Sequence, residues 1–303
     1  MNNQLERVRC NLCGADSYEV LHPAKYDQEK DKDLAVKFRS SGDETLIDQV
    51  VKCKHCGLIY INPRLKSGLI IRGYSQGEDE MFVSQAKGRE LTFARSLKLM
   101  NKHFPKKGRV LDVGTAGGSF LHVAKKDGWQ VWGCEPNRWL TKWAKKHYKL
   151  NITPGTIFDG KYKSNFFDVV TLWDVLEHTP DPKRVLLECN RILKKGGLLV
   201  VNYPDLGSSI AKAMGKRWIF LLSVHLYYFT PKTIKKILNM TGFRTVKTKM
   251  HFQQLSLGYL IFRMQAYSNV LHKIGKTVSK GLRTDNLQIP YWLGQTLVLA
   301  KKK

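Results

Sequence analysis

Apolar and polar positions along the middle of the chain predict strands that alternate with helices. Five short apolar runs have the length of buried strands and end in polar residues, at 109–113, 130–134, 151–153, 167–172 and 197–202. Four longer stretches repeat apolar residues at helical spacing, at 88–104, 118–127, 137–148 and 181–193. Strands and helices in this order predict a parallel sheet that is covered by helices on both faces.

The pattern changes after Tyr203. A helix is predicted over TPKTIKKILNMTG (230–242), with Thr230 as its N-cap and Gly242 as its stop, and FRTVKTKM (243–250) predicts a strand. Residues 253–283 are predicted to be helical, and LGQTLVLAKKK (293–303) to contain the last strand. This part of the chain therefore adds a helical insertion before a final strand.

The chain is strongly basic, with a formal net charge of +26. From 207 to 303 it has 17 Lys and Arg residues against one acidic residue, Asp285. The positive electrostatic field of such a segment attracts nucleic acid, anionic lipid or phosphorylated substrates. A solvated lysine surface without a partner would have the same composition. The first residues form no apolar leader, and no stretch is apolar enough to cross a membrane, so we expect a cytoplasmic protein.

Four of the six cysteines form two C-x-x-C-G motifs, CNLCG with Cys10 and Cys13 and CKHCG with Cys53 and Cys56. Each motif turns two thiolates toward one centre, and two such motifs supply the four ligands of a tetrahedral zinc site. Four protein ligands leave no open position, so this zinc would be structural; redox-active pairs are the alternative. The charged stretch between the motifs, 27–44, is predicted to be a loop or a short hairpin.

The run VLDVGTAGGSF (110–120) places three glycines directly after a strand, where a backbone often approaches a nucleotide. A P-loop requires G-x-x-x-x-G-K-[ST], but Ser119 and Phe120 follow Gly118, so a triphosphate site is excluded. A dinucleotide site requires G-x-G-x-x-G and an acid after the next strand. Glu135 has the position of that acid, but G-T-A-G-G departs from the glycine pattern, so NAD is only a weak alternative.

S-adenosylmethionine fits these residues better, because it carries a ribose diol, an adenine and an amino-acid end but no phosphate. Glu135 can accept hydrogen bonds from both ribose hydroxyls. The amides of the turn Gly114–Gly118, which includes Thr115, would face the carboxylate of the methionine end at the start of a helix. Asp112 would support the turn or bind the ammonium group through water.

Further motifs give the chain a family resemblance. The motifs are CNLCG, CKHCGLIYINPR, VLDVGTAGGSF, CEPN, DVVTLWDVLEH, LKKGGLLVV and HLYYFTPKTIKKILNMTGF. With them, the chain resembles class I S-adenosylmethionine-dependent methyltransferases that carry an N-terminal zinc-binding ribbon. The resemblance covers nearly the whole chain. It implies an α/β, Rossmann-like fold with a seven-stranded sheet and an antiparallel last strand. It also implies a zinc ribbon at 1–65 and a methyltransferase domain at 66–303, with the basic insertion at about 253–283.

The same resemblance assigns residues to the cofactor. It places Asp112, Gly114 and Gly117 at the cofactor turn, Glu135 at the ribose, and both Trp173 and Asp174 beside the methionine end. Family members often carry an acid after the third strand, where this chain has Thr156. Ile157 and Phe158, which follow it, are available to pack on adenine.

Two histidines are candidate catalytic bases. Transfer of a methyl group mainly requires alignment and exclusion of water, but an alcohol or a protonated amine also needs a base. His178, in LEHTPDP, and His225, in SVHLYYFT, can act in this way because a neutral imidazole accepts a proton near pH 7. Glu177 or Asp174 would orient His178, which could instead cap the helix that starts near Asp181.

The acceptor is less constrained than the donor. No N-P-P-[YF] follows the fourth strand, which argues against N-methylation of adenine or glutamine. The resemblance implies tailoring of sugars, polyketides or envelope glycans, so we expect O-methylation of a small-molecule or glycan acceptor. A ribosomal or transfer RNA methyltransferase is an alternative that the basic last third favours. A non-catalytic binding module is a further alternative, which the intact glycine turn and Glu135 disfavour.

The segment VLHKIGKTVSKGLR (270–283) suggests where a lipid-linked or phosphorylated glycan acceptor would be met. One face of the predicted helix carries Leu271, Ile274, Val278 and Leu282, and a neighbouring face carries Lys273, Lys276, Lys280 and Arg283. Such a helix can lie on an anionic membrane, here the inner membrane face. A helix packed on the domain with solvated lysines would show the same pattern.

Overall fold

The computed structural model describes residues 4–25, 46–78, 80–265 and 268–303. Its centre is a seven-stranded sheet in the order β12-β15-β10-β9-β6-β7-β8. The strands are β6 (Arg109–Val113), β7 (Gln130–Glu135), β8 (Thr153–Pro154), β9 (Phe167–Trp173), β10 (Leu193–Pro204), β12 (Phe243–Met250) and β15 (Gln295–Lys302). β15 is antiparallel to both β10 and β12, whereas β6 to β10 pair in parallel. The predicted α/β sheet with an antiparallel last strand is thus confirmed.

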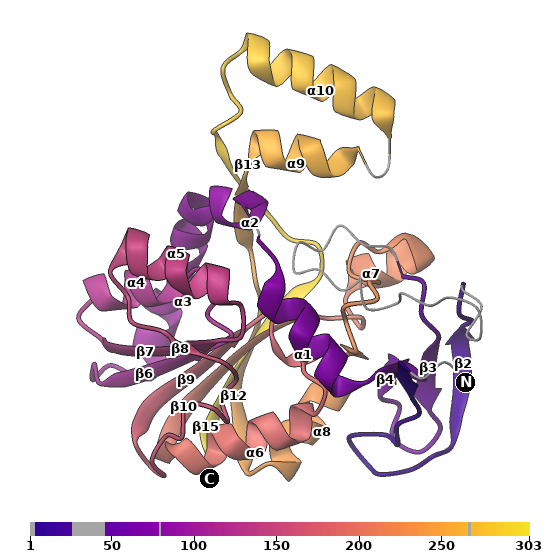
Figure 1. The fold of residues 1–303 in the computed structure, drawn as a ribbon, viewed down its shortest axis with the longest axis vertical. Coiled ribbons are helices and arrows are strands. Elements are labelled where there is room, and N and C mark those ends of the chain that lie inside the picture. Colours follow the sequence, from indigo (N-terminus) through magenta and orange to yellow (C-terminus); the bar gives the residue numbers. More distant parts are fainter. Residues whose placement is uncertain (1–3, 26–45, 79, 266–267) are drawn as a thin grey trace.

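Helices cover both faces of this sheet (Figure 1). They are α3 (Ala86–His103), α4 (Ser119–Lys126) and α5 (Arg138–Tyr148), and, on the other face, α6 (Pro182–Ile192) and α8 (Pro231–Met240). Successive residues of the central strands enter different cores: Val169 packs with the α3 side and Val170 with the α6 side. Leu198 and Leu199 alternate in the same way. Both faces of the strands are therefore buried, which is why these strands are continuous apolar runs.

Two regions differ from the sequence-based expectations. The connection after residue 66 contains α1 (Ser67–Gln76) and α2 (Glu80–Ser84), which were not expected. The insertion 253–283 is not helical throughout. It consists of β13 (Gln253–Ser256), α9 (Leu257–Met264) and α10 (Asn269–Gly281), and it closes with β14 (Gln288–Tyr291), which pairs antiparallel with β13. Because β13 finds its partner more than 30 residues later, local periodicity could not reveal it.

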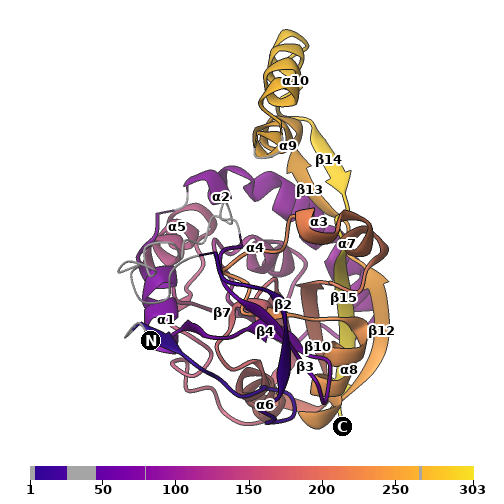
Figure 2. The ribbon, with the colours of Figure 1, turned by 90° about the vertical axis from the view of Figure 1, so that its right-hand side faces the viewer.

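The segment from β13 to β14 forms a lobe that projects from the body of the protein. In both ribbon views α9 and α10 lie side by side, beyond the end of the sheet (Figures 1 and 2). Between β10 and α8 the chain forms α7 (Ser209–Met214) and a short 3-10 turn, Gly215–Arg217. No helix among the described residues has the length and apolar content needed to cross a membrane.

The N-terminal ribbon shares a sheet with the rest of the chain. Its strands β2 (Tyr18–His22), β3 (Val50–Cys53) and β4 (Ile59–Ile61) are joined by β11 (Tyr227–Tyr228), which pairs antiparallel with β4. A second ladder joins β1 (Leu5–Glu6) to β5 (Arg64–Leu65). One hydrophobic cluster holds Leu12 and Leu58 of the ribbon together with Leu186 of α6. The ribbon is therefore packed into the main body, and the charged stretch 27–44 lies outside the described residues.

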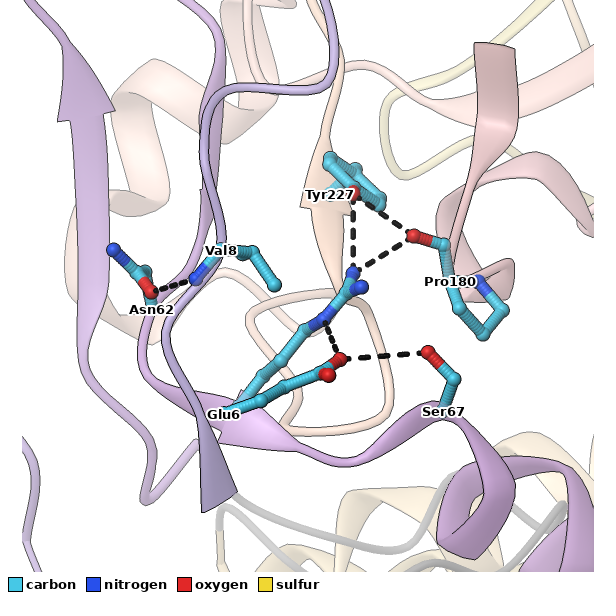
Figure 3. Close-up of polar contacts among 7 residues, drawn as sticks. Glu6, Val8, Asn62, Ser67, Pro180 and Tyr227 are labelled. Atoms are coloured by element: carbon cyan, nitrogen blue, oxygen red, sulfur yellow. Dashed lines mark hydrogen bonds and ion pairs between the residues drawn. The ribbon is translucent and has the colours of Figure 1, made fainter. Parts of the chain in front are cut away.

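A buried arginine at the end of the ribbon binds two distant loops (Figure 3). Arg64, which is 6% exposed, donates from Nε to Glu6 Oε1 at 3.2 Å. Its Nη1 donates to Pro180 O at 2.9 Å and to Tyr227 Oη at 3.1 Å. Tyr227 Oη in turn donates to Pro180 O at 3.1 Å. Ser67 Oγ also reaches Glu6, and Val8 N donates to Asn62 Oδ1, so the entry and exit of the ribbon are held at one place.

We expect Arg64→Met, which keeps the length of the side chain but removes the guanidinium, to lower the free energy of unfolding by about 2–4 kcal/mol. The cause is that Glu6 and Pro180 lose a buried charged donor. The shift of the urea midpoint at unchanged m measures the effect. Arg191→Met is the control, because Arg191 makes an exposed ion pair with Glu188 at 2.6 Å and should cost less than about 1 kcal/mol. Equal losses in the two variants would contradict a special role for Arg64.

Candidate functional site

A cavity of about 870 Å³ opens at the carboxyl ends of the parallel strands, the edge where open α/β sheets bind ligands. All ten of the predicted cofactor and catalytic residues line it. They are Asp112, Gly114, Thr115, Gly117, Glu135, Ile157, Trp173, Asp174, His178 and His225. The chain therefore brings residues from five separate segments to one site, although their individual roles remain predictions.

The glycine turn connects β6 to α4 and cannot be built from larger residues. Gly114 and Gly118 have φ values of 65° and 79°, in the left-handed region that favours glycine. A Cβ at Gly114 would also lie 2.8 Å from Val175 Cγ2. Glycine is thus required both for the backbone conformation and for the close approach of the loop after β9.

The amides of this turn are mostly used within the protein. Four of them donate to protein acceptors: Gly114 and Thr115 to Cys134 O (2.9 and 3.1 Å), Ala116 to Glu135 Oε2 (2.8 Å), and Gly118 to Thr115 O (2.9 Å). The expectation that the turn presents free amides to a ligand carboxylate is therefore wrong for these four. The physical reason is the tightness of the turn, which points its first amides back at the end of β7.

Glu135, the last residue of β7, is held by backbone donors. Its Oε2 accepts from Ala116 N and its Oε1 from Asn137 N, both at 2.8 Å. Each oxygen keeps a second lone pair, so the carboxylate can still accept from a ribose diol in the cavity. Burial raises the pKa of Glu135 to about 7, against the lowering effect of the two amides.

Asp112 and Asp174 are two further buried carboxyl groups of the cavity. Asp112 Oδ1 accepts from Thr171 Oγ1 at 2.6 Å, and burial raises the pKa of Asp112 to about 7. Asp174 has φ 52° and accepts from Asn202 Nδ2 at 2.6 Å and from Gln253 Nε2 at 3.0 Å. Burial raises its pKa to about 6. Both groups would gain from a positive charge placed between them.

Apolar residues close the floor of the cavity. The Trp173 ring packs against Phe93 and Phe120, with ring centroids 5.2 Å away in each case, and these two rings also pack on each other at 5.6 Å. Much of the Trp173 ring therefore belongs to the core. Ile157 is 1% exposed, and Phe158 beside it is half-exposed and covered by the guanidinium of Arg184 at 4.6 Å. Both residues line the cavity, and their packing on adenine stays a prediction.

His178 and His225 come together on the wall of the cavity. Their ring centroids are 4.7 Å apart. His178 Nδ1 lies 3.0 Å from Val224 O and 2.7 Å from Tyr74 Oη, and His225 Nδ1 lies 2.8 Å from Phe220 O. A carbonyl oxygen only accepts, so each ring carries its hydrogen on Nδ1 and leaves the Nε2 lone pair available. His178 thus does not cap α6, whose N-cap is Asp181.

Glu177 completes this cluster, which we name the Glu-His-His cluster (Glu177, His178 and His225). Each member brings one ligand atom within 4.8 Å of the others. Glu177 is 1% exposed, and neither of its carboxylate oxygens has a hydrogen-bond partner. Burial lowers the pKa of His178 to about 4 and that of His225 well below its usual value, and raises the pKa of Glu177 well above its own. Burial thus favours the neutral form of all three groups, and a proton or a cation that entered the cluster would change this balance.

Several residues of the cavity were not identified from the sequence. His251 is 4% exposed, has no hydrogen-bond partner on either ring nitrogen, and lies edge-on to Trp173 at 5.7 Å. Tyr74 comes from α1, Arg89 from α3 and Gln253 from β13. One signal was available for His251, because β12 runs parallel to β10 and its carboxyl end must reach the same edge of the sheet.

The four ribbon cysteines also meet. Their Sγ atoms lie within 4.8 Å of one another, with Cys10 and Cys56 at 3.4 Å and Cys13 and Cys53 at 3.5 Å. The two motifs have matching backbones: Gly14 N donates to Cys10 O at 2.8 Å, and Gly57 N donates to Cys53 O at 3.0 Å.

Comparison with known proteins identifies the family. The model of the family described as "Methyltransferase domain" matches residues 85–248, more than half of the chain, so the chain belongs to this family. An uncharacterised protein of Methanocaldococcus jannaschii is 27% identical over 185 residues, which cover 60% of this chain and 85% of that protein. A ubiquinone biosynthesis O-methyltransferase of Coxiella burnetii (strain Dugway 5J108-111) is 33% identical over 109 residues. That match covers 34% of this chain and about half, 47%, of the Coxiella protein.

A solved structure shows the same fold. The "SAM dependent methyltransferase" of Archaeoglobus fulgidus superposes with a TM-score of 0.51 and 23% sequence identity, covering 74% of this chain and all of that one. Its membership of the methyltransferase family identifies the protein as an enzyme, an S-adenosylmethionine-dependent methyltransferase.

The raised pKa values predict how the cofactor binds as pH changes. Glu135 and Asp112, each with a pKa of about 7, are largely ionised at pH 8 and protonated at pH 6. A protonated group is a weaker acceptor for ribose hydroxyls or ammonium. We therefore expect the affinity for S-adenosylhomocysteine, measured by calorimetry, to fall from pH 8 to pH 6, by about tenfold for each group that must be ionised.

Glu135→Gln is the matched variant for this measurement, because the amide keeps the shape of the side chain but cannot ionise. It should bind more weakly at pH 8 and lose one tenfold step of the pH dependence. An affinity of the wild-type protein that is flat between pH 6 and pH 8 would show that neither carboxyl group needs its charge.

Proposed function

We propose that the enzyme O-methylates a small-molecule acceptor of the sugar, envelope-glycan or lipid-linked kind. The Glu-His-His cluster carries this proposal, because it sets two neutral imidazoles on the wall of the cofactor cavity, with the buried carboxyl group of Glu177 beside them. An alcohol is the acceptor that needs such a base, since its proton must leave as the new bond forms. The relatives named ubiquinone biosynthesis O-methyltransferase support small-molecule O-methylation.

The donor end of the cavity would hold S-adenosylmethionine, which supplies an electrophilic methyl group on a sulfonium. Glu135 would accept from the ribose hydroxyls, and Ile157 would pack on adenine. The raised pKa values of Asp112 and Asp174 indicate carboxyl groups that gain from a cationic neighbour, as the ammonium and sulfonium groups would be. Arg89 lines the same cavity and would contribute positive charge near the ligand carboxylate.

At the acceptor end, Nε2 of His178 or His225 would take the hydroxyl proton. The backbone carbonyls at Nδ1 hold each ring in the tautomer that leaves Nε2 unprotonated. Glu177 lies beside both rings, and its ionised form would be the counter-ion of the imidazolium that forms. The base is thus oriented and neutral before the reaction.

We also propose that the four cysteines bind a structural zinc ion. The four sulfur atoms converge on one centre in two matching turns, which fits a tetrahedral ion. Burial raises the pKa of the Cys10 and Cys56 thiols, so their thiolates need a cation beside them. No position would remain for a substrate, and the ion would act by fixing the ribbon that carries Arg64.

Transfer of a labelled methyl group tests the acceptor and the base together. We expect label from S-adenosylmethionine to enter the lipid or polar small-molecule fraction of a cell extract as an alkali-stable ether, and not the RNA fraction. At least one of His178→Asn and His225→Asn should lower this transfer by about 10²–10⁴-fold, because the hydroxyl keeps its proton. Affinity for S-adenosylhomocysteine should stay within about threefold, since neither ring is placed at the cofactor end.

The control is His147→Asn, a replacement on the exposed side of α5. Label that appears only in RNA would overturn the small-molecule proposal, and two histidine variants with full transfer would remove the base. A chelator that abolishes transfer while the zinc stays bound would point to a second metal ion, provided that an added divalent cation restores transfer. The Glu-His-His cluster would then be a cation site and not a proton acceptor.

The zinc proposal has its own test. Metal analysis of the purified protein should give one zinc per chain, and Cys13→Ser should lose it and lower the melting temperature, because metal binding stabilises only the folded ribbon. Cys134→Ala is the control, since Cys134 lies in β7 and not in the ribbon. A protein without zinc, or a Cys13→Ser variant that melts like the wild type, would contradict a structural ion.

A further inference from the structure

The exposed side of α10 is unusual for a helix on a protein surface. Val270, Ile274, Val278 and Leu282 follow one another at four-residue spacing and are 67%, 57%, 52% and 69% exposed. An apolar row on this scale normally faces a partner. The side chain of Leu271, which the sequence placed in the same row, lies outside the described residues.

The opposite side of α10 is already occupied by α9. His272 Nδ1 lies 2.9 Å from Ile261 O, and a Cβ at Gly275 would lie 3.2 Å from Ile261 Cγ2. Ser279 is 2% exposed. His272 and Gly275 thus contact α9 directly, and the buried Ser279 lies on the same side of α10, so this side of α10 faces the lobe. The apolar row consequently points away from the lobe, and α9 cannot cover it.

Basic residues share this outward surface. Lys273 and Lys280 are exposed, and each lies about one helical turn from the exposed Thr277, on the side away from α9. Lys276 and Arg283, which are also exposed, flank them. Within the described part of the lobe, Asp285 is the one acidic residue, and it is engaged by Ser279 Oγ at 2.7 Å. An apolar row beside an unopposed basic row is complementary to a surface with an apolar interior and anionic headgroups.

The lobe also forms part of the cavity. Tyr259 and Arg263, one turn apart on α9, line it together with Leu255 of β13. The surface of α10 and the wall of the acceptor cavity are thus parts of one small unit, which Figures 1 and 2 show standing clear of the sheet. Whatever the apolar row contacts is brought close to the side of the cavity that the lobe forms.

We propose that the lobe, residues 253–291, docks the enzyme on an anionic lipid membrane through the outward surface of α10. Val270, Ile274 and Val278 enter the interface between headgroups and acyl chains, and Lys273 and Lys280 reach the anionic headgroups. α9 and the cavity wall that it forms then lie on the side of α10 that faces away from the bilayer. The use of this arrangement by a membrane-borne acceptor rests on the proposed function. The docking itself is independent of the proposed function.

Sedimentation with vesicles tests the docking without any methyl transfer. The protein should bind vesicles of phosphatidylcholine that contain phosphatidylglycerol and should bind only weakly to vesicles of phosphatidylcholine alone. Salt should release it, because the attraction between lysines and anionic headgroups is screened within about 10 Å at 0.1 M ionic strength. Lys273→Glu/Lys280→Glu should lower the partition by about 25-fold or more, as each lysine contributes about fivefold. Ile274→Asp/Val278→Asp should reduce it at least as much.

Matched controls keep the result specific. Lys145→Glu/Lys146→Glu changes two exposed lysines of α5, and Leu187→Asp changes a residue of α6 that is 49% exposed. Both should bind vesicles like the wild type, apart from the loss of general charge attraction. All variants should keep the wild-type affinity for S-adenosylhomocysteine, which shows that the body is intact.

Four results would overturn the proposal. The first is no binding to phosphatidylglycerol vesicles, and the second is an equal loss of binding in the lobe variants and the control variants. The third is self-association without lipid that Ile274→Asp/Val278→Asp abolishes, and the fourth is binding of RNA in place of vesicles by the same lysines. The third would make the row a contact between two copies, and the fourth a nucleic-acid surface. None of these depends on methyl transfer, so the proposed function stands or falls separately.

Discussion

A buried guanidinium holds together three segments that are far apart in the chain. Arg64 cannot lie in the interior without acceptors, and it finds them in Glu6, in the carbonyl of Pro180 and in the phenol of Tyr227. Pro180 comes two residues after His178, and Tyr227 two residues after His225. The interaction that secures the ribbon therefore also sets the distance between the two histidine loops. The ribbon is part of the wall of the site, and metal binding by its cysteines would act on the site through this contact.

The cavity combines buried acids with buried neutral imidazoles, and this combination suits a cationic ligand. Burial alone disfavours the charged form of Asp112, Glu135 and Asp174, which raises each pKa toward neutrality. A ligand that brings positive charge into the cavity restores their ionised form, so binding and deprotonation are coupled. The histidines respond in the opposite sense, because a cation nearby keeps them neutral. Cofactor binding would thus prepare the acids as ligands and the imidazoles as bases in one step.

The sequence was sufficient for those parts of the site that depend on local order along the chain. The strand end at Val113 follows from an apolar run, and the end of β7 at Glu135 was predicted to within one residue. Glycine at 114 follows from the turn that must begin there. The parts it could not supply depend on contacts between distant segments. β11 is two residues long and exists only because β4 lies beside it, and β13 exists because β14 returns to it. The use of the turn amides by Cys134 and Glu135 could not be read from the order of glycines either.

The position of the lobe follows from the topology of the sheet. β15 is antiparallel to both neighbours, so β12 runs in the same direction as β10, and its carboxyl end lies at the ligand-binding edge. Anything inserted between β12 and β15 must start at that edge, which is why His251 and Gln253 enter the cavity directly after β12. The entropy of closing a longer loop rises slowly with its length, and the β13-β14 ladder closes this one at its base. An insertion here can consequently add an external contact surface and reshape the acceptor side of the cavity. It leaves Glu135 and the glycine turn unchanged, because they lie across the sheet, on β7 and after β6.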